Sequence, residues 1–247
     1  MGVLVTIPDL PGYGRTVVPD PGSIRYAHWQ DLLIDLIRKE HDERPLILVG
    51  ASIGGLLAYD AAAATGLASA LVVTCLLDPR SAAVRDRLTW HPVLSRLGGP
   101  ALRLLPGPLA GLRVPIRWIA DMRHIANSPA LVREVLRDKR GGGGRVPLGW
   151  MRSFLEAGPL VEPEAFARTP VLMVHPAQDK WTPFELSEPF FNRIRAQKQV
   201  VMLDGCGHFP IEQPGFTRMI EAVRAVRDDI AGQAPLTGRP GRRHPLS

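Results

Sequence analysis

Residues 45–58 read Pro-Leu-Ile-Leu-Val-Gly-Ala-Ser-Ile-Gly-Gly-Leu-Leu-Ala, and this stretch decides the fold. Its first five residues form an apolar run that predicts a buried strand, and the small and apolar residues at its end predict a helix. Between them, Gly50-Ala51-Ser52-Ile53-Gly54 has the pattern Gly-x-Ser-x-Gly, in which a sharp strand-to-helix turn exposes the serine hydroxyl. The glycines on both sides, Gly50 and Gly54, leave room for such a turn. The context predicts that Ser52 is a nucleophile, and a plain tight turn is the alternative interpretation.

A nucleophilic serine needs a general base and an acid that orients the base, and the second half of the chain offers both. The apolar strand predicted at 170–175 runs into a loop that carries Asp179. The strand predicted at 199–204 runs into Gly205-Cys206-Gly207-His208, where two glycines indicate a flexible, exposed turn. The chain order Ser52, Asp179, His208 is the order expected of α/β-hydrolases.

On these residues the chain resembles the α/β-hydrolases, and within them the lysophospholipase, monoacylglycerol lipase and serine aminopeptidase-like branch. The resemblance extends over about residues 1–230 and is carried by Pro8–Gly14, Gly50–Gly55, Asp179 and Gly207-His208. It implies that Ser52 is the nucleophile, Asp179 the orienting acid and His208 the general base. It also implies that the N–H of Ile53 is one donor of the oxyanion hole.

The resemblance further implies that the first strands of the family are missing from the printed chain, because Val3–Gly14 is similar to the family's fourth strand and its loop. The missing part would include a His-Gly loop that supplies the second oxyanion N–H, and losing one such donor costs on the order of 10²–10³ in rate. We interpret the chain as N-terminally shortened, through the choice of gene start or a true deletion. If it is whole, strand 3–9 should pair with strand 45–50, which would bring Leu10 or Gly12 to a place where either could supply the second N–H. The competing outcome is a gap beside strand 45–50 and an oxyanion hole with only the Ile53 N–H.

The remaining periodicity predicts an α/β fold. Apolar strands alternate with amphipathic helices, which is typical of a mostly parallel sheet with helices on both faces. Sites in such sheets lie beyond the carboxyl ends of the strands. We expect helix 24–40 to begin after a Ser23 cap. The other expected elements are strands 3–9, 45–50, 69–78, 170–175 and 199–204 and helices 54–65, 183–197 and 214–231.

The chain divides into three expected parts: a hydrolase core at 1–79 and 169–231, a helical cap inserted between strands at 80–168, and a disordered tail at 232–247. Within the cap, Ser128 and Pro129 predict the start of a helix. The four glycines 141–144 indicate either a hinge or a passive linker. Three tryptophans suggest an apolar lining for an acyl group, although each one alone is better explained as core: Trp90, Trp118 and Trp150.

The charge of the chain is concentrated in the cap. Residues 80–152 hold 14 basic and 4 acidic residues, whereas the whole chain has a formal net charge of +6. A cationic cap could attract anionic lipid surfaces or anionic substrates, and solvated arginine is the plainer alternative. We expect no nucleic-acid partner, because no recognition module accompanies the basic runs. The sequence leaves the oligomeric state open.

Composition and targeting signals favour an ordinary globular protein. The 247 residues are 45% hydrophobic and 22% charged. No apolar run approaches the roughly 18 residues that a membrane span needs, and the start of the printed chain lacks the features of a signal peptide. A cytoplasmic location is therefore expected. We expect no metal and no cofactor, since the histidines lack ligand spacing and no strand leads into a phosphate-binding glycine loop. Cys75 is expected to be a buried structural thiol.

Three other polar residues compete for roles in the site. Asp78 also ends a predicted strand and is the alternative acid. Asp9 is expected to form a turn, and His175 to line the pocket or the core.

The expected function is that of a serine hydrolase that cleaves carboxylic esters of acyl or lipid-like small molecules through an acyl-enzyme on Ser52. Amide, thioester and lactone substrates stay open. One alternative is a catalytically impaired, N-terminally truncated remnant that acts as a binding protein. Another is a basic surface-binding protein.

Overall fold

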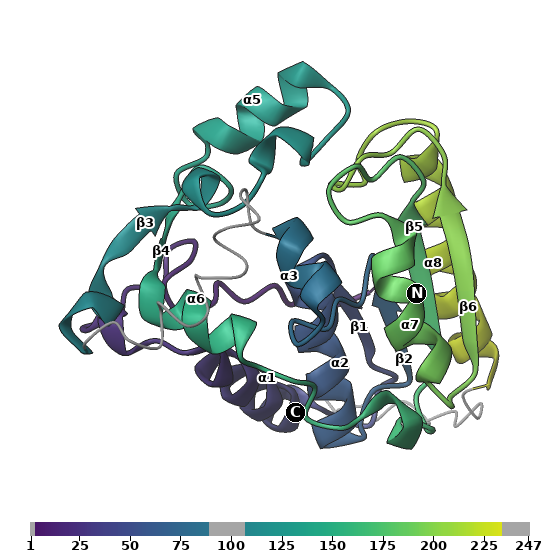
Figure 1. Cartoon of the computed structure of the whole chain (residues 1–247). Coiled ribbons are helices and arrows are strands. Elements are labelled where there is room, and N and C mark those ends of the chain that lie inside the picture. Colours follow the sequence, from purple (N-terminus) through teal and green to yellow (C-terminus); the bar gives the residue numbers. More distant parts are fainter. Residues whose placement is uncertain (1–2, 89–106, 234–247) are drawn as a thin grey trace, which may run out of the picture.

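The computed structural model describes residues 3–88 and 107–233, and within them the centre of the fold is a four-stranded parallel sheet (Figure 1). The strand order is β1-β2-β5-β6, in which every pair is parallel. The strands are β1 Ile47–Gly50, β2 Ala70–Val73, β5 Val171–Pro176 and β6 Lys198–Leu203. The predicted α/β fold with a mostly parallel sheet is confirmed, although β2 is shorter than the expected strand 69–78.

Alternate residues of the strands face opposite sides of the sheet, and both sides of the two central strands are buried, which is why β2 and most of β5 are apolar. Leu71 and Met173 belong to a core cluster that includes helices α2 and α7. Val72 and Leu172 point the other way and pack with helix α8. Both faces of the sheet are therefore covered by helices.

In the described residues the helices are α1 Tyr26–Glu40, α2 Ile53–Thr65, α3 Ala82–Leu88, α5 Pro129–Arg137, α6 Leu148–Leu155, α7 Phe184–Arg193 and α8 Gly215–Gln233. Helices α1, α2, α5, α7 and α8 lie where helices were expected, and α3 and α6 fall within the insert, where no individual helix was predicted at these residues. Short 3-10 turns lie at Pro21–Ser23, Gly107–Gly111, Ile116–Trp118, Met122–His124 and Pro163–Ala165. Strand β3 Arg113–Pro115 pairs antiparallel with β4 Arg145–Pro147 in a separate two-stranded sheet.

Two helix starts test the expected caps. Ser128 caps α5 and its hydroxyl accepts the Leu131 N–H, with Pro129 in the first position, as predicted. Ser23 does not cap α1, because Asp20 and Pro21 close a separate 3-10 turn that contains Ser23. The N-cap position of α1 belongs to Arg25 instead.

A second apolar cluster joins α1 and α2 to α6 of the insert. The rings of Trp29 and Trp150 lie 4.4 Å apart, and Trp150 stacks on Phe154 at 5.6 Å. Trp150 is therefore a core residue, as expected for each tryptophan taken alone, and not part of an acyl-binding surface. Trp118 is 62% exposed and lines no apolar interior. Trp90 lies outside the described residues, as do residues 234–247 of the predicted disordered tail 232–247. The tail boundary at 232 is wrong, because α8 continues to Gln233.

The expected strand 3–9 is wrong, and so is its predicted pairing with strand 45–50. Residues 3–10 form no strand, and Ile7 is 85% exposed. The following turn is tied to α1, because the Trp29 indole N–H donates to the Pro11 carbonyl at 3.0 Å. A strand needs a partner that satisfies its backbone groups, and the described residues provide none for this segment. The suggestion that Leu10 or Gly12 would supply an oxyanion N–H loses its basis with the pairing.

The turn from β1 to α2 is held by close backbone packing. A Cβ on Gly50 would clash with the Gly54 carbonyl and lie 2.9 Å from the Ala58 Cβ. A Cβ on Gly55 would clash with the Cys75 carbonyl, whereas one on Gly54 would meet nothing within 4 Å. Close packing therefore requires glycine at positions 50 and 55. Of the two glycines that the sequence motif suggested, Gly50 and Gly54, only Gly50 has no room for a side chain.

We predict that Gly50→Ala destabilises the protein by about 1–3 kcal/mol or more, because the added methyl must push α2 away from β1. Gly54→Ala is the matched control, and it should leave stability unchanged or slightly raised, since alanine favours the helix. Denaturant unfolding of both variants measures the difference. Equal stability of the two variants would contradict the packing argument.

Candidate active site

Ser52 sits on the turn between β1 and α2 in a strained backbone conformation, with φ 54° and ψ −125°. Such a conformation costs a non-glycine residue on the order of 1–3 kcal/mol and persists only when neighbouring contacts fix it. The Ser52 N–H donates to the Thr74 hydroxyl at 3.0 Å, and the Ser52 carbonyl accepts the Gly55 N–H at 2.8 Å. The hydroxyl of Ser52 is thereby held at the carboxyl end of the sheet.

The structure brings the three predicted residues together. The His208 Nε2 lies 2.8 Å from the Ser52 Oγ, and the His208 Nδ1 lies 2.8 Å from the Asp179 Oδ2. An ionised carboxylate can only accept, so Nδ1 carries the proton and Nε2 is free to accept one from the hydroxyl. His208 and Asp179 are both 5% exposed, so the prediction of an exposed histidine turn is wrong.

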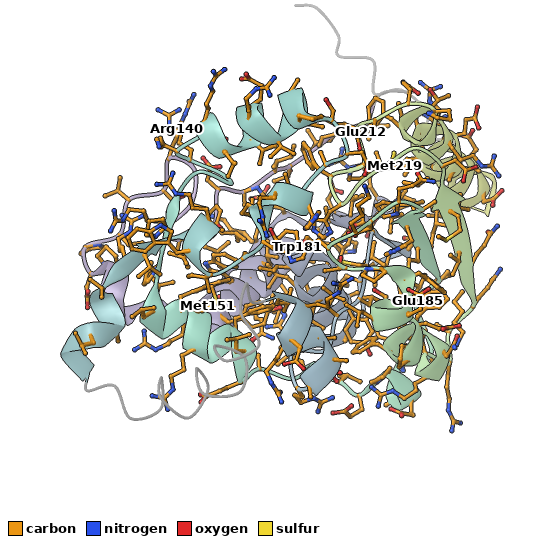
Figure 2. All side chains as sticks on the ribbon, turned by 45° about the horizontal axis from the view of Figure 1, so that its top comes forward. Arg140, Met151, Trp181, Glu185, Glu212 and Met219 are labelled. Atoms are coloured by element: carbon orange, nitrogen blue, oxygen red, sulfur yellow. The ribbon has the colours of Figure 1, made fainter. Side chains whose placement is uncertain are left out.

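Two neighbours that the sequence analysis missed enclose this row. The Trp181 ring lies 4.7 Å from the His208 ring, and its indole N–H donates to the Arg87 carbonyl at 3.1 Å. Figure 2 shows Trp181 near the centre of the molecule. The Thr182 hydroxyl donates to the Asp179 Oδ2 at 2.9 Å and lies 2.9 Å from the His208 Nδ1. The sequence did hold a signal for this contact, because Thr182 follows Asp179 by three residues and its hydroxyl can reach the carboxylate across a turn.

The environment of Asp179 keeps its carboxyl ionised. Burial alone raises the pKa of Asp179, but the hydrogen bond and charge of His208 and the hydrogen bonds from Thr182 outweigh burial and hold that pKa below its ordinary value. The Trp181 and Thr182 N–H groups donate to the Asp179 Oδ1 at 2.9 and 2.8 Å. A fixed carboxylate at this place can stabilise a positive charge on the imidazole of His208.

One candidate oxyanion donor lies beside Ser52. Ile53 is the first residue of α2, where N–H groups have no partner within the helix. Its N–H donates no backbone hydrogen bond to any residue in the described ranges. The positive end of the α2 dipole points the same way, so the place favours developing negative charge.

The competing residues lie outside this row. Asp78 pairs with Arg80 at 2.8 Å and makes no hydrogen bond with His208. His175 is buried with its Nδ1 2.9 Å from the Thr74 carbonyl, which confirms a core position. The Asp9 carboxylate accepts the Arg15 N–H at 2.9 Å, as expected of a turn former.

Burial raises the pKa of the Cys75 thiol to about 12, consistent with an inert structural cysteine.

The insert meets the site along the histidine loop. The Phe209 N–H donates to the Ile125 carbonyl at 2.7 Å, so part of the insert lies against the residue after His208. The division of the chain into a core at 1–79 and 169–231 and a cap at 80–168 stays a prediction. The four glycines 141–144 form hydrogen-bonded turns in which the Gly143 N–H donates to the Asp138 carbonyl at 2.9 Å.

Basic residues of the insert line an open hollow at the surface. Gly12–Gly14 and Gly141 also line it, and Figure 2 shows Arg140 at the surface near the end of α5. The basic residues are Arg113, Lys139, Arg140 and Arg145. Contact of this basic surface with anionic lipids or substrates stays a prediction.

Among the described residues, no cluster of three or more His, Cys, Asp or Glu is arranged to hold a metal ion. In the same part of the chain, no helix is both long and apolar enough to cross a membrane.

A parallel sheet with a serine turn after its edge strand, and with acid and histidine loops after two other strands, is the architecture of an α/β-hydrolase. The sequence matches the model of the alpha/beta hydrolase family over residues 2–218, and the chain belongs to this family. Membership supports hydrolase activity. A search of curated protein sequences gave no match.

Solved structures similar to this chain share its fold at low sequence identity. A monoacylglycerol lipase of Paleococcus ferrophilus is 19% identical with a TM-score of 0.60, over 91% of this chain and 82% of the lipase. An esterase of Exiguobacterium antarcticum is 15% identical with a TM-score of 0.55, over 89% and 78%. A thermophilic esterase of Thermogutta terrifontis is 19% identical with a TM-score of 0.54, over 90% and 78%.

We predict that Thr182→Val lowers kcat/KM for an ester substrate by at least about tenfold, because it removes a hydrogen bond to the charged carboxylate that orients His208. Thr182→Ser keeps the hydroxyl and should retain most activity. Thr169→Val is the matched control, since Thr169 is a buried threonine whose hydroxyl donates to the Ala68 carbonyl instead. Steady-state kinetics would contradict the role if the two valine variants lost activity equally.

Proposed function

We propose that the protein is a serine hydrolase that cleaves carboxylic esters of small acyl or lipid-like molecules. The observation that carries the proposal is the continuous hydrogen-bonded row from the Ser52 Oγ through His208 to Asp179, with 2.8 Å at both steps. Nucleophile, base and orienter within hydrogen-bond reach are the geometry that nucleophilic catalysis requires. Family membership and the fold shared with esterases and a lipase support the same reaction class.

In the proposed reaction, the Ser52 Oγ attacks the ester carbonyl carbon while the His208 Nε2 takes the hydroxyl proton. The tetrahedral intermediate carries a negative oxygen, to which the Ile53 N–H can donate. Its collapse breaks the bond to the alcohol, and His208 returns the proton to the leaving oxygen. An acyl ester on Ser52 and a free alcohol result.

Water completes the cycle by the same steps. His208 takes a proton from a water molecule, which attacks the acyl carbon, and the proton then passes to the Ser52 Oγ as the acyl–oxygen bond breaks. The products are a carboxylic acid and the free serine. Throughout, the Asp179 carboxylate holds the Nδ1 proton and stabilises the imidazolium, and a cofactor is not needed.

We predict that a fluorophosphonate probe labels folded wild-type protein at Ser52, because the activated hydroxyl displaces fluoride from phosphorus. Ser52→Ala and unfolded wild-type protein should stay unlabelled, as seen by gel fluorescence and mass spectrometry of the modified peptide. Labelling that persists in Ser52→Ala would refute the nucleophile. A folded wild type without any labelling would favour the alternative, an impaired fold that acts by binding.

We predict that Asp179→Asn lowers kcat by on the order of 10⁴-fold, as for the corresponding aspartate of a serine protease, because the amide favours the wrong histidine tautomer. Asp78→Asn removes the carboxylate of the alternative acid and should keep activity within about threefold, since Asp78 pairs with Arg80 and not with His208. Hydrolysis of an activated short-chain ester measures both. The reverse result would move the acid to Asp78.

A further inference from the structure

A second carboxylate, that of Glu212, lies next to the histidine loop and receives three backbone N–H groups. Its Oε2 accepts from Gly207 at 2.7 Å and from Asn127 at 3.2 Å. Its Oε1 accepts from Ser128 at 2.7 Å. Gly207 belongs to the loop of the core that carries His208, whereas Asn127 and Ser128 belong to the insert, directly before α5. Figure 2 shows Glu212 on the side of the molecule where these two parts meet.

The charge of Glu212 is suited to this place. No basic side chain in the described part of the chain forms an ion pair with Glu212. Its negative charge is stabilised by the three backbone N–H groups instead. Two of them lie at the amino end of the nine-residue helix α5, where the helix dipole favours a negative group. Hydrogen bonds to an ionised acceptor are also stronger than neutral ones.

On the core side, Glu212 holds the Cys206–Gly207 peptide, one residue before His208. Besides accepting the Gly207 N–H through its side chain, its carbonyl accepts from the Cys206 thiol at 3.0 Å. The Cys206 carbonyl in turn accepts the Gln178 N–H at 3.0 Å, next to Asp179. The loops of the base and of the acid are thereby held to each other and to Glu212.

On the insert side, the backbone before α5 packs directly on the same loop. A Cβ on Gly207 would lie 2.8 Å from the Asn127 nitrogen and 2.9 Å from Ala126. The side-chain amide of Asn127 donates to the Gly205 carbonyl at 3.4 Å, and the Ile125 carbonyl accepts the Phe209 N–H. Residues 125–128 and the histidine loop are therefore in contact along both sides of Gly207.

From this geometry we propose that Glu212 is a positioning residue that couples the seating of α5 to the placement of His208. The coupling rests on the proposed function, because it assigns His208 as the base. When α5 moves off the loop, the carboxylate loses two of its three donors, and the one left is the N–H beside His208. The site is therefore competent when α5 is seated, and α5 is held firmly when the histidine loop is in its active conformation.

Hydrogen exchange of the full chain tests the coupling without substrate. In Glu212→Gln the side chain keeps its length, but an NH₂ group replaces one acceptor oxygen. We expect segments 125–131 and 205–209 both to exchange at least tenfold faster, and kcat to fall about tenfold with little change in KM. Glu221→Gln is the matched control, since Glu221 on α8 pairs only with Arg218 among the described residues. It should change neither the exchange rates of the two segments nor kcat.

A second variant approaches the contact from the other side. Gly207→Ala leaves Glu212 in place but pushes residues 126 and 127 away from the loop, so it should also speed exchange in both segments. Faster exchange in the histidine loop alone, in either variant, would overturn the coupling and leave Glu212 a local support. If Ser52 stays unlabelled by the fluorophosphonate in wild type while both segments respond together, the proposed catalytic function fails and the link between α5 and the loop stands.

Discussion

The strained turn at Ser52 is the constraint on which the rest of the structure depends. A serine with φ 54° is stable only because the chain on both sides is fixed, by the pairing of β1 with β2 and by the packing of α2 at Gly50 and Gly55. The hydrogen bond from the Ser52 N–H to Thr74 adds a link to the neighbouring strand end. Strain at this point presents the hydroxyl outward, where two other loops can reach it.

Those two loops reach the serine because parallel strands end at the same edge of the sheet. Asp179 follows β5 and His208 follows β6, so these two neighbouring strands place the carboxylate and the imidazole side by side. Short-range hydrogen bonds then fix each side chain: Asp179 accepts from its own turn, and Glu212 accepts from the residue before His208. Burial of the pair strengthens these interactions, since the surroundings have a low dielectric constant.

The insert contributes to the site through its backbone more than through its side chains. The tryptophans that suggested an acyl-binding surface lie elsewhere: Trp150 belongs to the core with α1, and Trp118 faces solvent. The contacts near His208 come from residues 125–128 and from the Arg87 carbonyl that accepts the Trp181 indole N–H. Side-chain composition did not indicate these contacts, because a backbone carbonyl or N–H has no signature in the sequence.

The sequence by itself predicted the four strands of the sheet, helices α1, α2, α5, α7 and α8 and the serine turn, because apolar periodicity and glycine spacing are local properties of the chain. It also singled out Ser52, Asp179 and His208, which the structure brings together. It did not determine that His208 is buried, that Thr182 contacts both Asp179 and His208, that Glu212 accepts from Gly207, or that residues 3–10 have no strand partner among the described residues. Each of these depends on which segments meet in space. A strand forms only beside another strand, and a carboxylate finds its backbone donors only when distant loops pack together, so the tertiary structure alone decided them.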